Sequence, residues 1–236
     1  MDYRKPAVFG DNWSPSRYKV LPYFAIEKAV LSRPDMQRIL EIGCGNGWNM
    51  SRFAQHNRIA FGLDAVPERV ALAQAHGPAL LADGLRLPFA DSSLDLIYIQ
   101  HVLHHIGDAE RALIEVRRCL RPGGVLFLIE TVEDNPLIRL GRKVHPSWLG
   151  DEITTSFTFA GLATQLAGSG FRVTRAGQYS VLFWLWEILP DQIPAMEKVT
   201  PYIVPVEQSL QRYGRRYSAH CFLVAEKEQW PAPAAP

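Results

Sequence analysis

The sequence predicts an α/β domain built on a doubly wound, mostly parallel sheet of seven strands. Three observations predict this fold: short apolar runs alternate with helical patterns, the first run ends at a glycine-rich loop, and acidic residues close the next two runs. A length of 236 residues favours one domain with insertions over two independent domains. The chain is 47% hydrophobic and 21% charged, which is ordinary for a globular protein with a sizeable core.

Strands are predicted where apolar and β-branched residues run together between turns. They fall at residues 38–42, 59–63, 79–82, 94–100, 125–130, 171–178 and 216–227. Helical patterns occupy about 48–55, begin again at Pro67, and run from a capping Asp108 to about Leu120, after which Arg121–Gly124 form a turn. This alternation is typical of βαβ units, and therefore of a parallel sheet.

Two segments rich in proline and tryptophan interrupt the alternation, at about 131–157 and 179–215, with no regular pattern. We expect them to form cap insertions, because long connections at strand ends often carry binding residues. An apolar helical pattern at about 18–31 makes residues 1–34 a candidate N-terminal lid, although an ordinary packed helix explains it equally well. Residues 35–227 then form the main domain, and 228–236 a disordered tail.

Charge and cysteine use suggest the cellular context. Lys and Arg number 25 against 24 Asp and Glu, and this balance argues against a nucleic-acid partner. Cys44, Cys119 and Cys221 have neither disulfide nor metal-ligand spacing, which predicts a reduced, cytoplasmic location and no metal site. No signal peptide or transmembrane helix is expected. The apolar C-terminal half leaves open peripheral contact with the inner face of the membrane. The protein could be a monomer or a homodimer.

The strongest motif is the loop Glu41–Gly47, which follows the first strand and precedes the first helix. Its glycines allow a tight turn and close approach to a ligand, which the helix N–H groups then face. A dinucleotide fingerprint needs glycine where this chain has Trp48, which argues against the alternative of a nicotinamide-dependent oxidoreductase. Asp64 and Asp83 close the next two strands, so three strand ends meet at the edge where ligands bind in such sheets.

These motifs resemble those of class I S-adenosylmethionine-dependent methyltransferases. Within that class, the chain is similar to the broad group that includes ubiquinone and menaquinone C-methyltransferases. The resemblance covers about residues 38–130, which carry EIGCGNG, GLD, ADGLRLPFADSSLDLIYIQHVLHHI and LRPGGVLFLIE in that order. It implies a Rossmann-like methyltransferase fold with S-adenosyl-L-methionine as the cofactor. It does not identify the acceptor.

The resemblance also implies residue roles at the cofactor. The glycine loop would face the methionine part, with Glu41 fixing the loop and the amino group. Asp64 would accept hydrogen bonds from the ribose hydroxyls and Asp83 from the adenine amine, while Gln100 and His101 would lie under the sulfonium. The implied cofactor-binding residues are Glu41, Gly43, Cys44, Gly45, Gly47, Asp64, Ala65, Asp83, Gly84, Leu85, Gln100 and His101.

Candidate acceptor residues are histidines, aromatics and a basic cluster. A histidine can remove a proton near neutral pH, so His101 and His145 are candidate catalytic bases, against the alternative that such histidines only line a pocket. The aromatic segment 179–190 is too short to span a bilayer; it either packs in the core or forms the wall of a pocket for a lipophilic acceptor. The candidate substrate contacts are Trp13, Tyr18, His104, Arg142, Trp148 and Trp184.

The predicted function is methyl transfer from S-adenosylmethionine to a small, partly lipophilic acceptor, at a hydroxyl or an activated ring carbon. The donor is already activated, so the protein mainly supplies position and, for an oxygen acceptor, a base. One alternative is a protein that binds the same cofactor for other chemistry. A macromolecular methyltransferase is disfavoured, because IQHVLHH stands where an Asn/Asp-Pro-Pro-Tyr loop would handle a planar amine.

Overall fold

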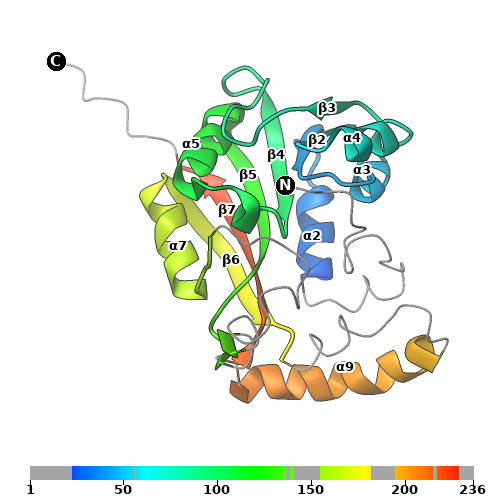
Figure 1. Ribbon diagram of the computed structural model, residues 1–236, viewed down its shortest axis with the longest axis vertical. Coiled ribbons are helices and arrows are strands. Elements are labelled where there is room, and N and C mark those ends of the chain that lie inside the picture. The colour runs from blue at the N-terminus through cyan, green and yellow to red at the C-terminus, as the bar shows by residue number, and fades with distance from the viewer. Residues whose placement is uncertain are drawn as a thin grey trace.

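The computed structural model describes residues 23–55, 57–136, 139–140, 155–181, 195–214 and 217–228. These residues contain one seven-stranded sheet with the order β3-β2-β1-β4-β5-β7-β6 (Figure 1). The strands are β1 (Arg38–Ile42), β2 (Ile59–Asp64), β3 (Ala79–Leu81), β4 (Leu94–Gln100), β5 (Leu120–Thr131), β6 (Phe171–Tyr179) and β7 (His220–Lys227). β7 is antiparallel to both of its neighbours, and the other pairs are parallel. The predicted mostly parallel sheet is therefore confirmed.

Helices cover both faces of the sheet, as a doubly wound fold requires (Figure 1). The side chains of β4 alternate between the faces: Leu96 and Tyr98 join one buried cluster, and Ile97 and Ile99 join the other. The first cluster includes residues of α2 (Phe24–Leu31), α3 (Trp48–Phe53) and α4 (Pro67–Ala73), and the second those of α5 (Ala109–Cys119) and α7 (Phe159–Gly168). Both faces of β4 are thus buried, which explains why its sequence is a nearly continuous apolar run.

The start of β5 differs from the prediction. Leu120 already pairs with Leu94, and Val125 pairs with Leu96, so the four residues between them bulge out of the ladder. Gly123 adopts a φ of +71° within this bulge, a conformation that glycine adopts readily. The RPGG motif therefore makes an irregularity inside a longer strand, instead of a turn before a shorter one.

A long helix also occupies part of the second predicted insertion. α9 (Ala195–Gly214) spans 20 residues, where Pro201 and Pro205 make the sequence pattern irregular. It runs across the end of the molecule at which β6 stops and β7 starts (Figure 1). Its Glu207 is buried and accepts a hydrogen bond from the backbone N–H of Val181 at 2.6 Å, which fixes the helix to the end of β6. Among the described helices, none combines the length and the apolar character needed to cross a bilayer.

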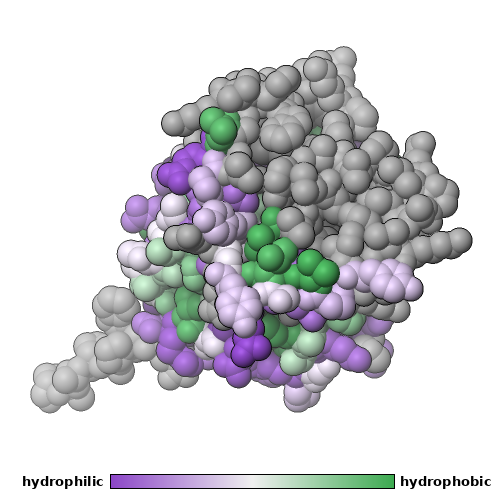
Figure 2. Space-filling model, turned by 90° about the horizontal axis from the view of Figure 1, so that it is seen from below, coloured by the Kyte–Doolittle hydropathy of each residue, from purple (hydrophilic) through white to green (hydrophobic). Residues whose placement is uncertain are grey.

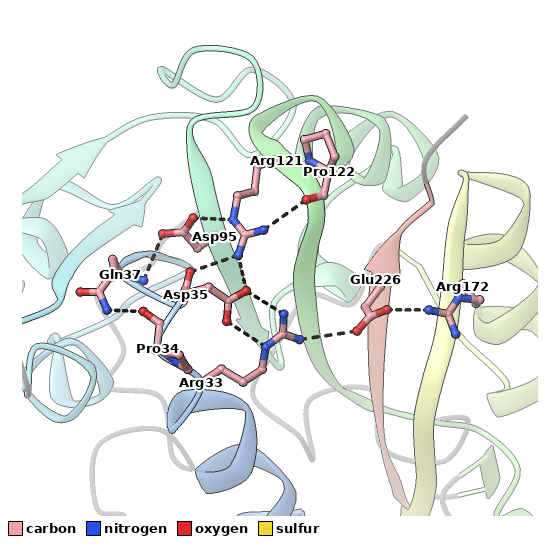
Figure 3. Close-up of polar contacts among 9 residues, drawn as sticks. All are labelled: Arg33, Pro34, Asp35, Gln37, Asp95, Arg121, Pro122, Arg172 and Glu226. Atoms are coloured by element: carbon pink, nitrogen blue, oxygen red, sulfur yellow. Dashed lines mark hydrogen bonds and ion pairs between the residues drawn. The ribbon is translucent and has the colours of Figure 1, made fainter. Parts of the chain in front are cut away.

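A network of charged residues ties the amino-terminal edge of the sheet together (Figure 3). Asp95, at the start of β4, accepts hydrogen bonds from the backbone N–H groups of Gln37 and Arg38 at 3.0 and 2.7 Å. Its other carboxylate oxygen accepts from Nε of Arg121 at 2.7 Å, and Arg121 also reaches Asp35 at 2.5 Å. The same side chains thus join the starts of β1, β4 and β5, and the carboxyl ends of these strands lie at the opposite edge.

Candidate active site

The glycine loop after β1 is closely packed at its ends and open at its centre. Gly43, Gly45 and Gly47 have φ values of +71°, +54° and +83°, which side-chain-bearing residues rarely adopt. A Cβ on Gly43 would lie 2.1 Å from Val102, and one on Gly47 would lie 2.9 Å from the backbone of Ala73. A Cβ on Gly45 would meet nothing within 4 Å, so the middle of the loop faces open space that a ligand can approach.

Asp64 connects the end of β2 to this loop. It is 5% exposed, and its two oxygens accept hydrogen bonds from the backbone N–H groups of Gly45 and Val66, each at 3.0 Å. A carboxylate offers about four lone-pair sites, so each oxygen retains capacity for a further donor such as a ribose hydroxyl.

The adenine-side residues that the sequence indicated follow β2 and β3. Ala65 and Asp83 are exposed, and Asp83 accepts a hydrogen bond from the backbone N–H of Leu85 at 2.9 Å. Gly84 is buried, and a Cβ there would lie 2.9 Å from Ile106. Cys44 is also buried, and burial raises the pKa of its thiol to about 12, so it remains a thiol at neutral pH.

Glu41 is a buried carboxyl group at the end of β1. Its Oε1 accepts a hydrogen bond from the amide of Asn49 at 2.6 Å, and the same amide lies 3.2 Å from Oε1 of Gln100. Its Oε2 is buried and has no hydrogen-bond partner among the described residues, and burial raises the pKa of Glu41 to about 8. An ammonium group placed here would supply the missing donor and the opposite charge, so the site fits the amino group of S-adenosylmethionine.

A chain of buried polar groups supports Glu41 from the side of α2. Asn49 accepts a hydrogen bond from Nη2 of Arg52 at 2.8 Å, and Arg52 also forms an ion pair with Glu27. Glu27 is 1% exposed and accepts a hydrogen bond from the hydroxyl of Tyr98 at 3.3 Å. Its pKa is raised because burial outweighs the opposing effect of Arg52. Glu27, Asn49 and Arg52 were not among the predicted site residues, because no motif marks the contact of α3 with Glu27 on α2.

Histidines from two strands meet at the carboxyl edge of the sheet. His101 follows β4 with a φ of +52°, and its Nδ1 lies 3.2 Å from Oγ1 of Thr131 at the end of β5. Nδ1 of His220, the first residue of β7, lies 3.4 Å from the same hydroxyl, and the two imidazole centroids are 4.9 Å apart. His220 was not among the predicted site residues, since only the antiparallel pairing of β7 with β5 brings it beside Thr131.

His104 is paired with a buried carboxylate. It lies in a short 3₁₀ helix, Leu103–His105, and its Nδ1 is 2.5 Å from Oε1 of Glu130. Burial alone would raise the pKa of Glu130, but the charges of His104 and His101 and the N–H of Thr131 outweigh it and lower the pKa. The carboxylate therefore remains ionised and orients the imidazole of His104, which is itself 5% exposed.

Trp13, Tyr18, Arg142, His145, Trp148 and Trp184 lie outside the described residues. Within the described ranges, no group of three or more His, Cys, Asp or Glu side chains could hold a metal ion.

Comparison with known proteins identifies the domain. Residues 40–128 match the methyltransferase domain family. The tRNA (carboxymethyluridine(34)-5-O)-methyltransferase of Schizosaccharomyces pombe is 32% identical over 126 residues, which are 52% of this chain and 54% of that protein. The uncharacterized methyltransferase YcgJ of Bacillus subtilis is 28% identical over 144 residues, 55% of this chain and 57% of that one. The chain thus spans about half the length of these curated relatives.

Solved structures extend the likeness over most of the chain. An S-adenosylmethionine-dependent methyltransferase from Mesorhizobium loti has a TM-score of 0.64 at 19% identity, covering 89% of this chain and 99% of that one. The structure of YcgJ has a TM-score of 0.60 at 18% identity, with coverages of 87% and 98%. At these identities the likeness shows the fold alone, so the likeness to quinone methyltransferases and the absence of a nucleic-acid partner stay predictions. Residues 40–128 are thus a class I methyltransferase domain whose cofactor is S-adenosyl-L-methionine, as the motifs predicted.

Proposed function

We propose that this protein transfers a methyl group from S-adenosylmethionine to the hydroxyl of a small, partly apolar acceptor. The observation that carries this proposal is the group of His101, His104 and His220, which lie where β4 and β5 end and where the antiparallel β7 begins. A hydroxyl gains nucleophilicity when a positioned base removes its proton, and histidine can do this near neutral pH. An activated ring carbon that bears a hydroxyl would use the same base.

The chain's own residues would bind and orient the two reactants. Glu41 would hold the amino group of the cofactor, Asp64 the ribose hydroxyls, and Asp83 the adenine amine. The bound cofactor supplies an electrophilic methyl group, so the protein contributes mainly orientation, which can account for much of the barrier reduction. His101, next to Gln100 at the end of β4, would receive the acceptor's proton.

Apolar side chains near this edge support an acceptor with an apolar part. Seen from the side on which α9 lies, hydrophobic residues gather near the middle of the surface, among polar ones (Figure 2). On α9 itself, Tyr202 and Tyr213 are 78% and 85% exposed. The formal net charge of +1 favours a small acceptor over tRNA, the substrate named for the Schizosaccharomyces pombe relative.

The test is methyl transfer from S-adenosylmethionine labelled in the methyl group. Purified protein would be incubated with simple phenols, alkyl-substituted hydroquinones and, in parallel, tRNA that carries carboxymethyluridine at position 34, the substrate named for the Schizosaccharomyces pombe relative. We expect label in the phenolic products, and its loss in the His101→Ala variant when cofactor binding is unchanged. Label in tRNA alone would replace the proposed acceptor class with RNA. Label in none of these acceptors, from protein that binds the cofactor, would refute the proposed acceptor.

A further inference from the structure

One hydroxyl group joins two imidazole rings at the acceptor side of the site. We propose that His101, Thr131 and His220 form a proton relay, which carries the acceptor's proton from His101 through the Thr131 hydroxyl to His220. The proposal rests on the proposed hydroxyl acceptor, and it assigns a role to two residues that no sequence motif marks. His101 would be the catalytic base, and Thr131 and His220 the residues that position it and take over its proton.

The geometry allows the two rings to be in different protonation states at Nδ1, and the proposed relay needs them to be so. Oγ1 of Thr131 lies 3.2 Å from Nδ1 of His101 and 3.4 Å from Nδ1 of His220. A threonine hydroxyl has one hydrogen to donate and lone pairs to accept. It can therefore accept from one Nδ1–H while donating to the other Nδ1, which must carry a lone pair. Two imidazoles bridged in this way are ready to exchange a proton without moving.

The order of the strands sets the direction of the relay. β4 lies beside β1, which carries the glycine loop, whereas β7 is separated from β4 by β5. His101 directly follows Gln100, whose side chain contacts the same Asn49 amide that binds Glu41. His101 therefore lies on the cofactor side and His220 on the far side. A proton left on His101 would put a second positive charge near the sulfonium, and its transfer to His220 reduces that repulsion.

The proton balance can be written atom by atom. The acceptor's O–H bond breaks as its oxygen gains the methyl group, and Nε2 of His101 receives the proton. His101 gives its Nδ1 proton to Oγ1 of Thr131, and Thr131 gives its own hydroxyl proton to Nδ1 of His220. His101 ends as a neutral imidazole with its proton on Nε2, and His220 as an imidazolium. The positive charge that begins on the sulfonium thus ends on His220.

Three further observations indicate that the relay is held in place. His101 has a φ of +52°, a strained conformation for a residue with a side chain, and such strain is concentrated at functional sites. The N–H of Thr131 donates to Oε1 of Glu130 at 2.7 Å, the oxygen that also contacts His104 at 2.5 Å. The buried carboxylate of Glu130 is thus joined to the relay through the backbone of Thr131, and the charge of His101 is among those that lower its pKa. The ring of Tyr179, 5.5 Å from that of His220, packs against the far end.

Nitrogen-15 NMR of histidine-labelled protein tests the relay without any acceptor. His101→Gln and His220→Gln variants would assign the two sets of ring signals. We expect one ring to carry its proton on Nδ1 and the other on Nε2 at pH values where both are neutral. Thr131→Val should abolish this fixed pattern and Thr131→Ser should retain it, while Thr164→Val, on the exposed side of α7, should change nothing. Two rings with the same tautomer, or a pattern unaffected by Thr131→Val, would overturn the relay.

Turnover with a phenol that the protein methylates gives the second test. Thr131→Val and His220→Gln should each lower kcat by about 10- to 100-fold and leave the KM for S-adenosylmethionine unchanged. This loss is smaller than the roughly 100- to 10,000-fold that a general base itself contributes, because His101 remains in place. Thr131→Ser should restore most of the rate. Unchanged kcat values in both variants would overturn the relay and leave the proposed function standing. If no phenol is methylated, the proposed function fails, and the NMR pattern still decides whether the relay exists.

Discussion

Binding of S-adenosylmethionine should release a proton from Glu41. This carboxyl group is buried, its Oε2 has no hydrogen-bond partner among the described residues, and its pKa is raised to about 8. At pH 6.5 roughly 97% of the free protein therefore carries this proton. The ammonium group of the cofactor stabilises the ionised carboxylate, which lowers its pKa in the complex. Since the amino group of the ligand is itself mostly protonated at pH 6.5, the net release is about 0.9 proton.

The sign of the pH dependence follows from this linkage. Because the complex holds fewer protons than the free protein and ligand, affinity should rise by about tenfold per pH unit between pH 6 and 7. It should level off near pH 8, where the free carboxyl group is half ionised and the ligand's amino group begins to lose its proton. Stronger binding at pH 6 than at pH 7 would contradict the reasoning.

Isothermal titration calorimetry in buffers of different ionisation enthalpy measures the released proton directly. S-adenosylhomocysteine, which keeps the amino group and lacks the reactive methyl, is a suitable ligand. Glu41→Gln is the matched variant, since glutamine has the same shape and cannot ionise; it should bind more weakly and release no proton. Equal heats in all buffers for the unmodified protein would refute the assignment. So would a Glu41→Gln variant that still releases the proton.

Three further predictions concern stability and the glycine loop. Arg121→Ala should lower the free energy of unfolding by about 1–3 kcal/mol in urea titrations, because it removes a charged hydrogen bond from the side chain of Asp95, which is 7% exposed. Arg172→Ala should change it by less than about 0.5 kcal/mol, because the Arg172 side chain, which pairs with Glu226, is 63% exposed. Equal changes in the free energy of unfolding for Arg121→Ala and Arg172→Ala would contradict the stabilising role of the network around Asp95. Gly43→Ala should weaken cofactor binding and destabilise the fold by about 1–3 kcal/mol, since the new Cβ would clash with Val102. A Cβ on Gly168 in α7 would meet nothing within 4 Å, so Gly168→Ala should be neutral in the same calorimetric and unfolding measurements. Leu113→Ala, at a fully buried position of α5, should cost about 2–5 kcal/mol without changing cofactor affinity in the protein that remains folded.

The parts of the fold that the sequence predicts are those decided by local patterns. The glycines after β1 and the carboxyl groups at strand ends are separated by short, regular intervals along the sequence. The edge of the sheet that binds the cofactor can therefore be inferred before any contact is known. The helix α9 was not inferred, because its stability depends on tertiary contacts such as that of Glu207 with Val181, while its two prolines oppose a helical pattern.

The acceptor side depends on contacts between distant residues. Thr131 and His220 are 89 residues apart, and only the antiparallel register of β5 and β7 joins them. Arg52 and Glu27 are likewise 25 residues apart and meet across two helices. No local spacing indicates either pair, which is why His101 could be chosen from its position after a strand, whereas its partners could not.

Calorimetric titration of the protein with S-adenosylmethionine, and separately with NADH, is the direct test of the cofactor assignment. We expect S-adenosylmethionine to bind at one site per chain and NADH not to bind. Asp64→Ala should weaken the cofactor's affinity by at least about tenfold, since buried hydrogen bonds to a charged group are lost, and its circular dichroism spectrum would show whether the fold persists. Failure of the folded protein to bind S-adenosylmethionine, or full affinity in the folded Asp64→Ala variant, would contradict the cofactor site described above.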